Sequence, residues 1–195
     1  MTPPFVHLRL HSEYSLVDGL VKLKSLVSTT AAREMPALAL TDEANLFGLV
    51  KFYTAAQGAG LKPIIGSDLW LHNPHDNAHP YRLTLLAMNA TGYRNLTELI
   101  SRGWTDGQRQ GRAILDKRWV MAQSDGLIAL SGGRDGEVGR HLLSEHYEEA
   151  KALLADWQTA FPERFYLELV RTGRALEETC VHESVRLAID TGTPV

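Results

Sequence analysis

Residues 37–71, ALALTDEANLFGLVKFYTAAQGAGLKPIIGSDLWL, decide the fold class of this chain. The run ALALT is short and apolar, which is typical of a buried strand. The stretch NLFGLVKFYTAAQGAG has the spacing of a helix and ends in glycines, and KPIIGSDLWL predicts a second strand. A strand, a helix and a strand in this order indicate parallel strands joined by a right-handed crossover. We therefore expect an α/β fold.

The rest of the chain repeats this alternation of apolar strands and amphipathic helices. Strands are expected at residues 5–10, 81–88, 126–131 and 164–170, and helices at 20–35, 91–103, 138–143, 147–160 and 175–192. This order predicts an open doubly wound sheet or a barrel, and periodicity does not decide between them. The sequence ends at GTPV, where a turn would lead into another buried strand. We interpret residues 1–195 as one domain fragment that continues in a longer protein, or as an incomplete barrel.

Composition favours a cytoplasmic protein without membrane contact. The net charge of -3 argues against binding duplex DNA through charge alone. Contact with single strands through Trp104 and Trp119 remains a weaker alternative. The single cysteine, Cys180, fits a reducing compartment and a packing role on a helix. Neither a signal peptide nor an apolar run of membrane-spanning length is found, and glycine-rich nucleotide-binding motifs are missing.

Polar side chains cluster where the predicted strands end. In HLRLH, residues 7–11, alternate side chains share a face, so His7, Arg9 and His11 point the same way. This spacing suggests a metal site, but the guanidinium at its centre has no lone pair to give. Carboxylates at other strand ends could hold divalent cations, or they could cap helices and pair with arginines. The histidines of the loop HNPHDNAHP, residues 72–80, are more simply explained as solvated.

Several segments together resemble one family. HLRLHSEYSLVDGL, ALTDEANLFGLVKFY, GLKPIIGSDL, RLTLLAMNATGYRNLTELIS, GLIALSGG and FPERFYLELVRTGR are similar to the N-terminal polymerase-and-histidinol-phosphatase (PHP) domain of bacterial DNA polymerase III alpha subunits. The resemblance covers nearly the whole chain and implies a distorted (β/α)7 barrel, incomplete here. It also implies that the catalytic carboxylates of DNA synthesis lie in other domains, so that none is assigned to this fragment.

The resemblance further implies a degenerate metal site. At the family's ligand positions stand Arg9, His11, Asp42, Glu43, Asp68, Arg82, Gly133 and Thr172. Arginines at two of these positions would place fixed positive charge where cations bind. We therefore expect no bound metal. If one bound, its candidate ligands would be His11, Asp42, Glu43 and Asp68. We predict instead that Arg9 or Arg82 pairs with Asp42, Glu43 or Asp68, because buried carboxylates need partners.

Two functions remain open at this point. The resemblance implies a structural and docking module of a DNA-directed DNA polymerase, a nucleotidyltransferase that uses Mg²⁺ outside this fragment. The implied partners are the polymerase core of the same chain, the proofreading exonuclease subunit, other subunits of the polymerase III holoenzyme, and DNA through the parent protein. The alternative is a residual metal-dependent phosphoesterase or pyrophosphatase, in which Arg9 and Arg82 bind phosphate.

Overall fold

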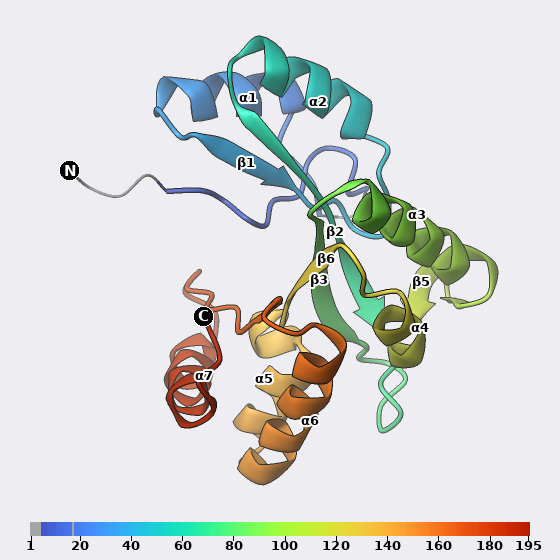
Figure 1. The fold of residues 1–195 in the computed structure, drawn as a ribbon, viewed down its shortest axis with the longest axis vertical. Coiled ribbons are helices and arrows are strands. Elements are labelled where there is room, and N and C mark those ends of the chain that lie inside the picture. The colour runs from blue at the N-terminus through green and yellow to red at the C-terminus, as the bar shows by residue number, and fades with distance from the viewer. Residues whose placement is uncertain (1–4, 17) are drawn as a thin grey trace.

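The computed structural model describes residues 5–16 and 18–195 as a seven-stranded sheet flanked by helices (Figure 1). The helices are α1 (Leu23–Ala32), α2 (Leu49–Gly58), α3 (Ala90–Thr105), α4 (Lys117–Ala122), α5 (Glu137–Leu143), α6 (Tyr147–Ala160) and α7 (Glu177–Thr191). The strands are β1 (Ala37–Leu40), β2 (Lys62–Leu71), β3 (Tyr81–Ala87), β4 (Gln108–Arg109), β5 (Arg112–Leu115), β6 (Leu127–Leu130) and β7 (Phe165–Tyr166). A short 3-10 helix, Gly133–Asp135, follows β6.

The long strand β2 organises the sheet. Its first half pairs with β1 in parallel, as the strand–helix–strand order of residues 37–71 predicts. Its second half pairs with β3 on one side and, at its last residues, with β5 on the other. From β3 the sheet continues through β6 to β7. Asp68, in the second half of β2, therefore has Thr84 of β3 on one side and an isolated bridge to Glu43 on the other.

Not all of the strands are parallel, which corrects the expectation from the alternating pattern. β3 runs antiparallel to both β2 and β6. The reason is local: β2 and β3 are joined by the loop at residues 72–80, without a crossover helix, so the chain turns back directly. The pairs β1–β2, β2–β5 and β6–β7 are parallel, and each is joined through at least one helix.

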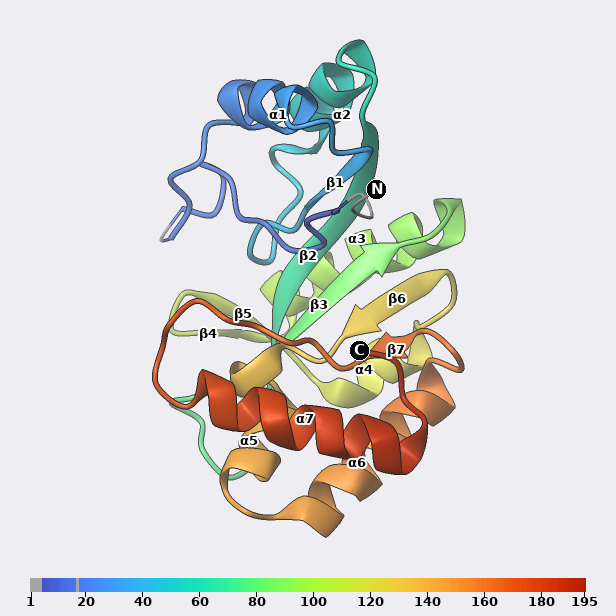
Figure 2. The same cartoon turned by 90° about the vertical axis from the view of Figure 1, so that its left-hand side faces the viewer.

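The sheet is open within the described residues, which confirms the expected incomplete, distorted barrel. At one edge the N-terminal segment lies beside β1: His7 bridges to Leu38, and the carbonyl of Leu10 accepts from the Thr41 N–H at 2.9 Å. At the other edge the Leu167 N–H donates to the carbonyl of Pro194 at 3.0 Å, which places the last residues beside β7 (Figure 2).

Two apolar cores hold the helices to the sheet. Near the chain's start, α1 and α2 pack on β1 through a cluster that contains Leu38 and Phe52. A larger cluster, which includes Leu85, Leu99 and Trp157, joins β2, β3 and β6 to α3, α5 and α6. Figure 1 shows α1 and α2 together at one end of the molecule and α5 to α7 at the other. No described helix is long and apolar enough to cross a membrane.

Several element boundaries differ from the sequence-based expectation. Residues 5–10 contribute a single bridge, at His7, and no regular strand, and the strand expected at 164–170 shortens to β7. The hairpin β4–β5 and helix α4 are additional elements, too short to show a hydrophobic period. Helix α3 begins at Ala90, one residue before the expected start, and is capped by Asn89, whose side chain accepts from the Gly92 N–H.

Candidate functional site

The site is built around Asp68, a fully buried carboxylate in the middle of β2. Its Oδ2 atom accepts from Arg9 Nε at 2.7 Å and from Arg82 Nη1 at 3.3 Å, and it lies 2.7 Å from His11 Nε2. Its Oδ1 atom accepts from the hydroxyl of Thr84. Burial alone raises the pKa of Asp68, but the bond from His11 and the charges of Arg9 and Arg82 outweigh it and lower that pKa to about 2. The predicted arginine–carboxylate pairing is confirmed at Asp68.

His11 lies between two carboxylates, one at each ring nitrogen. Its Nε2 faces Asp68, and its Nδ1 lies 3.0 Å from Asp18 Oδ1. Both nitrogens can donate only when the ring is an imidazolium. Burial lowers the pKa of His11, but the bonds and charges of the two carboxylates outweigh it and raise the pKa above 6.5. A ring that donates from both nitrogens has no lone pair left for a metal.

Arg9 connects the two open edges of the sheet. It lies on the N-terminal segment beside β1, and its Nη1 donates at 3.1 Å to Oε1 of Glu168, just beyond β7. Burial alone lowers the pKa of Arg9, whereas Asp68 and Glu168 raise it and keep the guanidinium charged. Burial raises the pKa of Glu168, although Arg9 opposes this shift. Segments 159 positions apart in the sequence are thus joined by one ion pair.

Asp42 is held by hydroxyl and amide groups, and no arginine pairs with it among the described residues. Ser12 donates to it from its backbone N–H at 2.6 Å and from its hydroxyl at 2.8 Å, and the Ser15 hydroxyl donates at 2.9 Å. Of the three carboxylates named as possible arginine partners, Asp42 is thus the one whose bonds come from serines. Glu43 makes only a long ion pair, 4.0 Å, with Arg82. The sequence cannot show that two serines reach Asp42 from a loop 27 to 30 positions away.

Gly133 and Thr172, the last two residues at the family's ligand positions, shape the backbone and a turn. Gly133 has φ of +55° in the 3-10 helix, and a Cβ built there would lie 3.2 Å from a methyl of Val170. Thr172 is turned toward Glu177, to which its N–H and its hydroxyl each donate at 2.6 Å. These bonds lower the pKa of Glu177 to about 2, and the bond from the Thr172 hydroxyl has the largest effect. Neither Gly133 nor Thr172 bonds to Asp68.

A cavity of about 450 Å³ opens beside Asp68. Arg9, His11, Arg82, Arg134 and Glu168 are among its lining residues. Three buried side-chain atoms of its lining residues have no hydrogen-bond partner: Nε of Arg82, Nε of Arg134 and Oε2 of Glu168. Two of the three are cationic donors, which a metal ion cannot satisfy. The residues therefore do not fit the metal cluster that the family implies, and no group of three or more His, Cys, Asp or Glu side chains is suitably arranged within residues 5–16 and 18–195.

Two direct partners of Asp68 and His11 were missed from the sequence. Thr84 lies directly opposite Asp68 in the β2–β3 register and shares a face of β3 with Arg82. The two-residue spacing of Arg82 and Thr84 could have revealed it. Asp18 binds His11 from an exposed loop with no periodic pattern, and no sequence signal predicts it.

Stability is expected to decline at both ends of the pH range because of this site. The folded-state pKa of Asp68 lies below its ordinary 3.8, so its contribution is complete above that pH and is lost as the pH falls through about 2. For His11, whose folded-state pKa is raised, the contribution is complete below about pH 6.5 and is lost as the pH rises through the raised value. Urea unfolding between about pH 2 and pH 9 measures both. A His11→Gln variant with an unchanged alkaline decline would contradict the second assignment.

Comparison with known proteins places this geometry in a family. A family model for the PHP domain matches residues 7–172. DNA polymerase III subunit alpha of Pseudomonas aeruginosa is 53% identical over 195 residues, and that of Escherichia coli K12 is 49% identical over 193 residues. These alignments cover 100% and 99% of this chain, and the chain spans 17% of each relative.

Two solved structures share the fold. An amidohydrolase from Chromobacterium violaceum, described with bound sulfate and no metal, has a TM-score of 0.63 at 14% identity, over 96% of this chain and 84% of its own. A crystal structure described as a putative metal-dependent phosphoesterase, from Bifidobacterium adolescentis, has a TM-score of 0.61 at 12% identity, over 98% and 85%. At such identities these structures support the fold alone. On the family match over residues 7–172, the chain belongs to the PHP domain family.

Proposed function

We propose that this chain is the PHP domain of a DNA polymerase III alpha subunit and that it acts there as a structural and docking module. The observation that carries the proposal is identity of 53% along the whole chain to a relative of that name. In the parent, DNA synthesis with Mg²⁺ takes place in other domains of a cytoplasmic replication enzyme. The domain braces the polymerase core and offers a surface to the proofreading exonuclease and other holoenzyme subunits.

The ion pairs at Asp68 support a structural role for the site over hydrolysis. Metal-assisted phosphoester hydrolysis needs ligand lone pairs that point at a cation. Here both oxygens of Asp68 accept bonds from side chains of this chain, and His11 faces a carboxylate at each nitrogen. We therefore propose that the family's metal site persists in this chain as a set of internal ion pairs, held by Arg9 and Arg82 in place of metal.

A chimeric polymerase subunit tests whether the chain acts as a structural and docking module. The chain replaces the matching region of the Pseudomonas aeruginosa subunit, and primer extension, exonuclease-subunit binding and hydrolysis of pyrophosphate and phosphomonoesters are measured on one preparation. We expect DNA synthesis and subunit binding comparable with the unmodified subunit, and no hydrolysis above the enzyme-free rate with added Mg²⁺, Mn²⁺ or Zn²⁺.

The matched control is the same chimera with Asp68→Asn. Its DNA synthesis should fall only in proportion to its folded fraction, with an unchanged KM for nucleotides. A folded chimera that does not synthesise DNA would contradict the proposed role as a structural and docking module. Hydrolysis that the chimera performs and the folded Asp68→Asn protein has lost would favour the phosphoesterase instead.

A further inference from the structure

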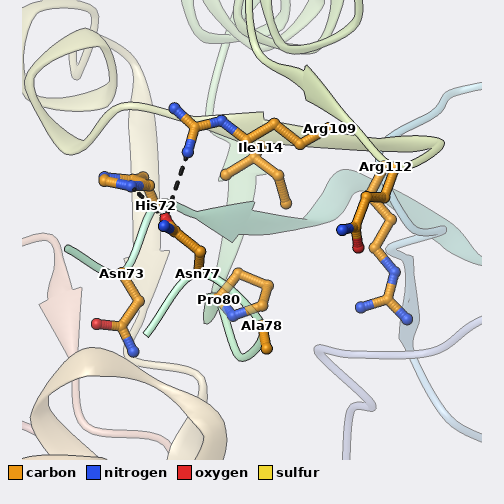
Figure 3. Close-up of a pocket in the computed structure, with 9 residues that line it drawn as sticks. His72, Asn73, Asn77, Ala78, Pro80, Arg109, Arg112 and Ile114 are labelled. Atoms are coloured by element: carbon orange, nitrogen blue, oxygen red, sulfur yellow. Dashed lines mark hydrogen bonds between the residues drawn. The ribbon is translucent and has the colours of Figure 1, made fainter. Parts of the chain in front are cut away.

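A second cavity, of about 500 Å³, lies away from Asp68, between the loop that joins β2 to β3 and the hairpin β4–β5 (Figure 3). A cavity of this size accommodates a small molecule. Its walls combine cationic, amide and apolar side chains: His72, Asn73, Asn77, Ala78, Pro80, Arg109, Gln110, Arg112 and Ile114. Nothing in the proposed function uses this cavity.

The charge of the cavity is one-sided. Two arginines and a histidine line it, and no carboxylate does among the described residues. The nearest acidic residues along the chain have other partners: Asp76 lies 2.6 Å from His79 Nδ1, and Asp116 is bonded to Arg118, although it also lies near enough to His72 for their charges to interact. The chain as a whole has a net charge of -3, so the positive charge of Arg109 and Arg112 is a feature of this part of the molecule alone.

The hairpin places the two arginines opposite each other. Arg109 and Arg112 are directly opposite each other in the β4–β5 pairing. Gln110 and Gly111 between them have φ of +50° and +80°, the signs of a type I′ turn. Like charges opposite each other across two strands repel, which destabilises the pair. Neither arginine has an ion-pair partner within residues 5–16 and 18–195, so a bound anion would supply the missing compensation.

Hydrogen bonds fix the opposite wall in place. The side-chain oxygen of Asn77 accepts from Arg109 Nη1 at 3.4 Å and lies 3.0 Å from His72 Nε2. Figure 3 shows Arg109 and His72 gathered around Asn77, with Arg112 on the other side of the cavity. Arg140 of α5 donates to the carbonyls of residues 79 and 80 at 2.6 and 2.8 Å, which anchors the end of the loop. Arg109 and Arg112 therefore lie on two sides of the cavity, and hydrogen bonds hold in place the loop that forms part of its wall.

We propose that this cavity binds a small phosphate-bearing molecule, with Arg109 and Arg112 as the charge-compensating contacts. Guanidinium groups match phosphate oxygens with paired hydrogen bonds, and each arginine offers such a contact from its own side of the cavity. The amides of Asn73 and Gln110 and the apolar side of Ile114 then surround the rest of the molecule. A free phosphate compound is favoured over a nucleic-acid strand because the cavity, at about 500 Å³, has the volume of a small-molecule site.

Thermal unfolding and titration of the 195-residue chain test this assignment with inorganic phosphate and adenosine monophosphate. Both ligands should raise Tm with concentration at constant ionic strength, because they bind the folded state. The double variant Arg109→Gln/Arg112→Gln should lose at least about tenfold in affinity. Without ligand it should melt no lower than the unmodified chain, since a repulsion has been removed. Arg94→Gln, at an exposed position on α3, is the control for removed positive charge and should bind normally.

Three outcomes would overturn the proposal. The first is no saturable binding of either ligand up to about 10 mM. The second is binding that survives in the double variant but is lost in Arg134→Gln, which would move the anion to the cavity beside Asp68. The third is tight binding of a single-stranded oligothymidylate at the two arginines without binding of inorganic phosphate or adenosine monophosphate, which would make this a nucleic-acid contact.

Discussion

Replacing Asp68 with alanine should lower the free energy of unfolding by roughly 3–5 kcal/mol. Its carboxylate compensates Arg9, His11 and Arg82 at distances of 2.7, 2.7 and 3.3 Å. Without it, three positively charged groups remain together around a buried position, which costs far more than losing one exposed pair. In a domain of this size such a loss lowers Tm by about 10 °C. No other single side chain of the described site compensates as many cationic groups.

Urea unfolding at neutral pH measures this loss. The matched control is Asp18→Ala, which removes a carboxylate that also bonds to His11 but is 48% exposed. That change should cost less than about 1 kcal/mol, because exposed ion pairs are weak. Equal stability of the Asp68→Ala variant and the unmodified chain would show that Asp68 does not hold the arginines in place.

The triple variant Arg9→His/Glu43→His/Arg82→His should gain divalent-metal affinity that the unmodified chain lacks. Two fixed positive charges disappear from the surroundings of Asp68. Three neutral imidazoles replace the two guanidinium groups and the carboxylate of Glu43. His11 already lies 2.7 Å from Oδ2 of Asp68, so one imidazole and one carboxylate of the new ligand set are preassembled. Three or four ligands of this type are typical of zinc sites, and we expect a dissociation constant near or below about 1 μM.

Titration calorimetry with Zn²⁺ and Mn²⁺ measures the gain, with circular dichroism to establish that the variant is folded. The control keeps the three new histidines and adds Asp68→Asn, which should weaken binding at least about tenfold if Asp68 is a ligand. A folded triple variant that binds metal no better than the unmodified chain would contradict the assignment of these residues to the family's ligand positions.

The fold was predictable from local patterns wherever an element is long enough to show a period. The strand–helix–strand unit of residues 37–71 has the predicted order and direction. The reversed direction of β3 was missed because apolar alternation reports a strand without its orientation. The polar loop at residues 72–80, which replaces a crossover helix, contained the information. The two-residue strand β4 offers no pattern to detect.

The site was only partly predictable, because its contacts join residues that are far apart in the sequence. The pairing of arginines with Asp68 follows from the requirement that a buried carboxylate be compensated. That requirement does not identify the partner: at Asp42 it is met by donors from Ser12 and Ser15 and not by an arginine. It also gave no indication that Arg9 would reach Glu168, 159 positions away, because this ion pair depends on how the open sheet curves.

The most direct test of the account is the metal content of the purified chain. The chain is dialysed with Zn²⁺ or Mn²⁺ in excess and then freed of unbound ions, and bound metal is counted by mass spectrometry beside the Asp68→Asn variant. The internal ion pairs predict less than about 0.1 ion per chain in both proteins, since Arg9 and Arg82 already neutralise the carboxylate. One or more ions per chain, lost on Asp68→Asn, would contradict the claim that arginines have taken the place of metal.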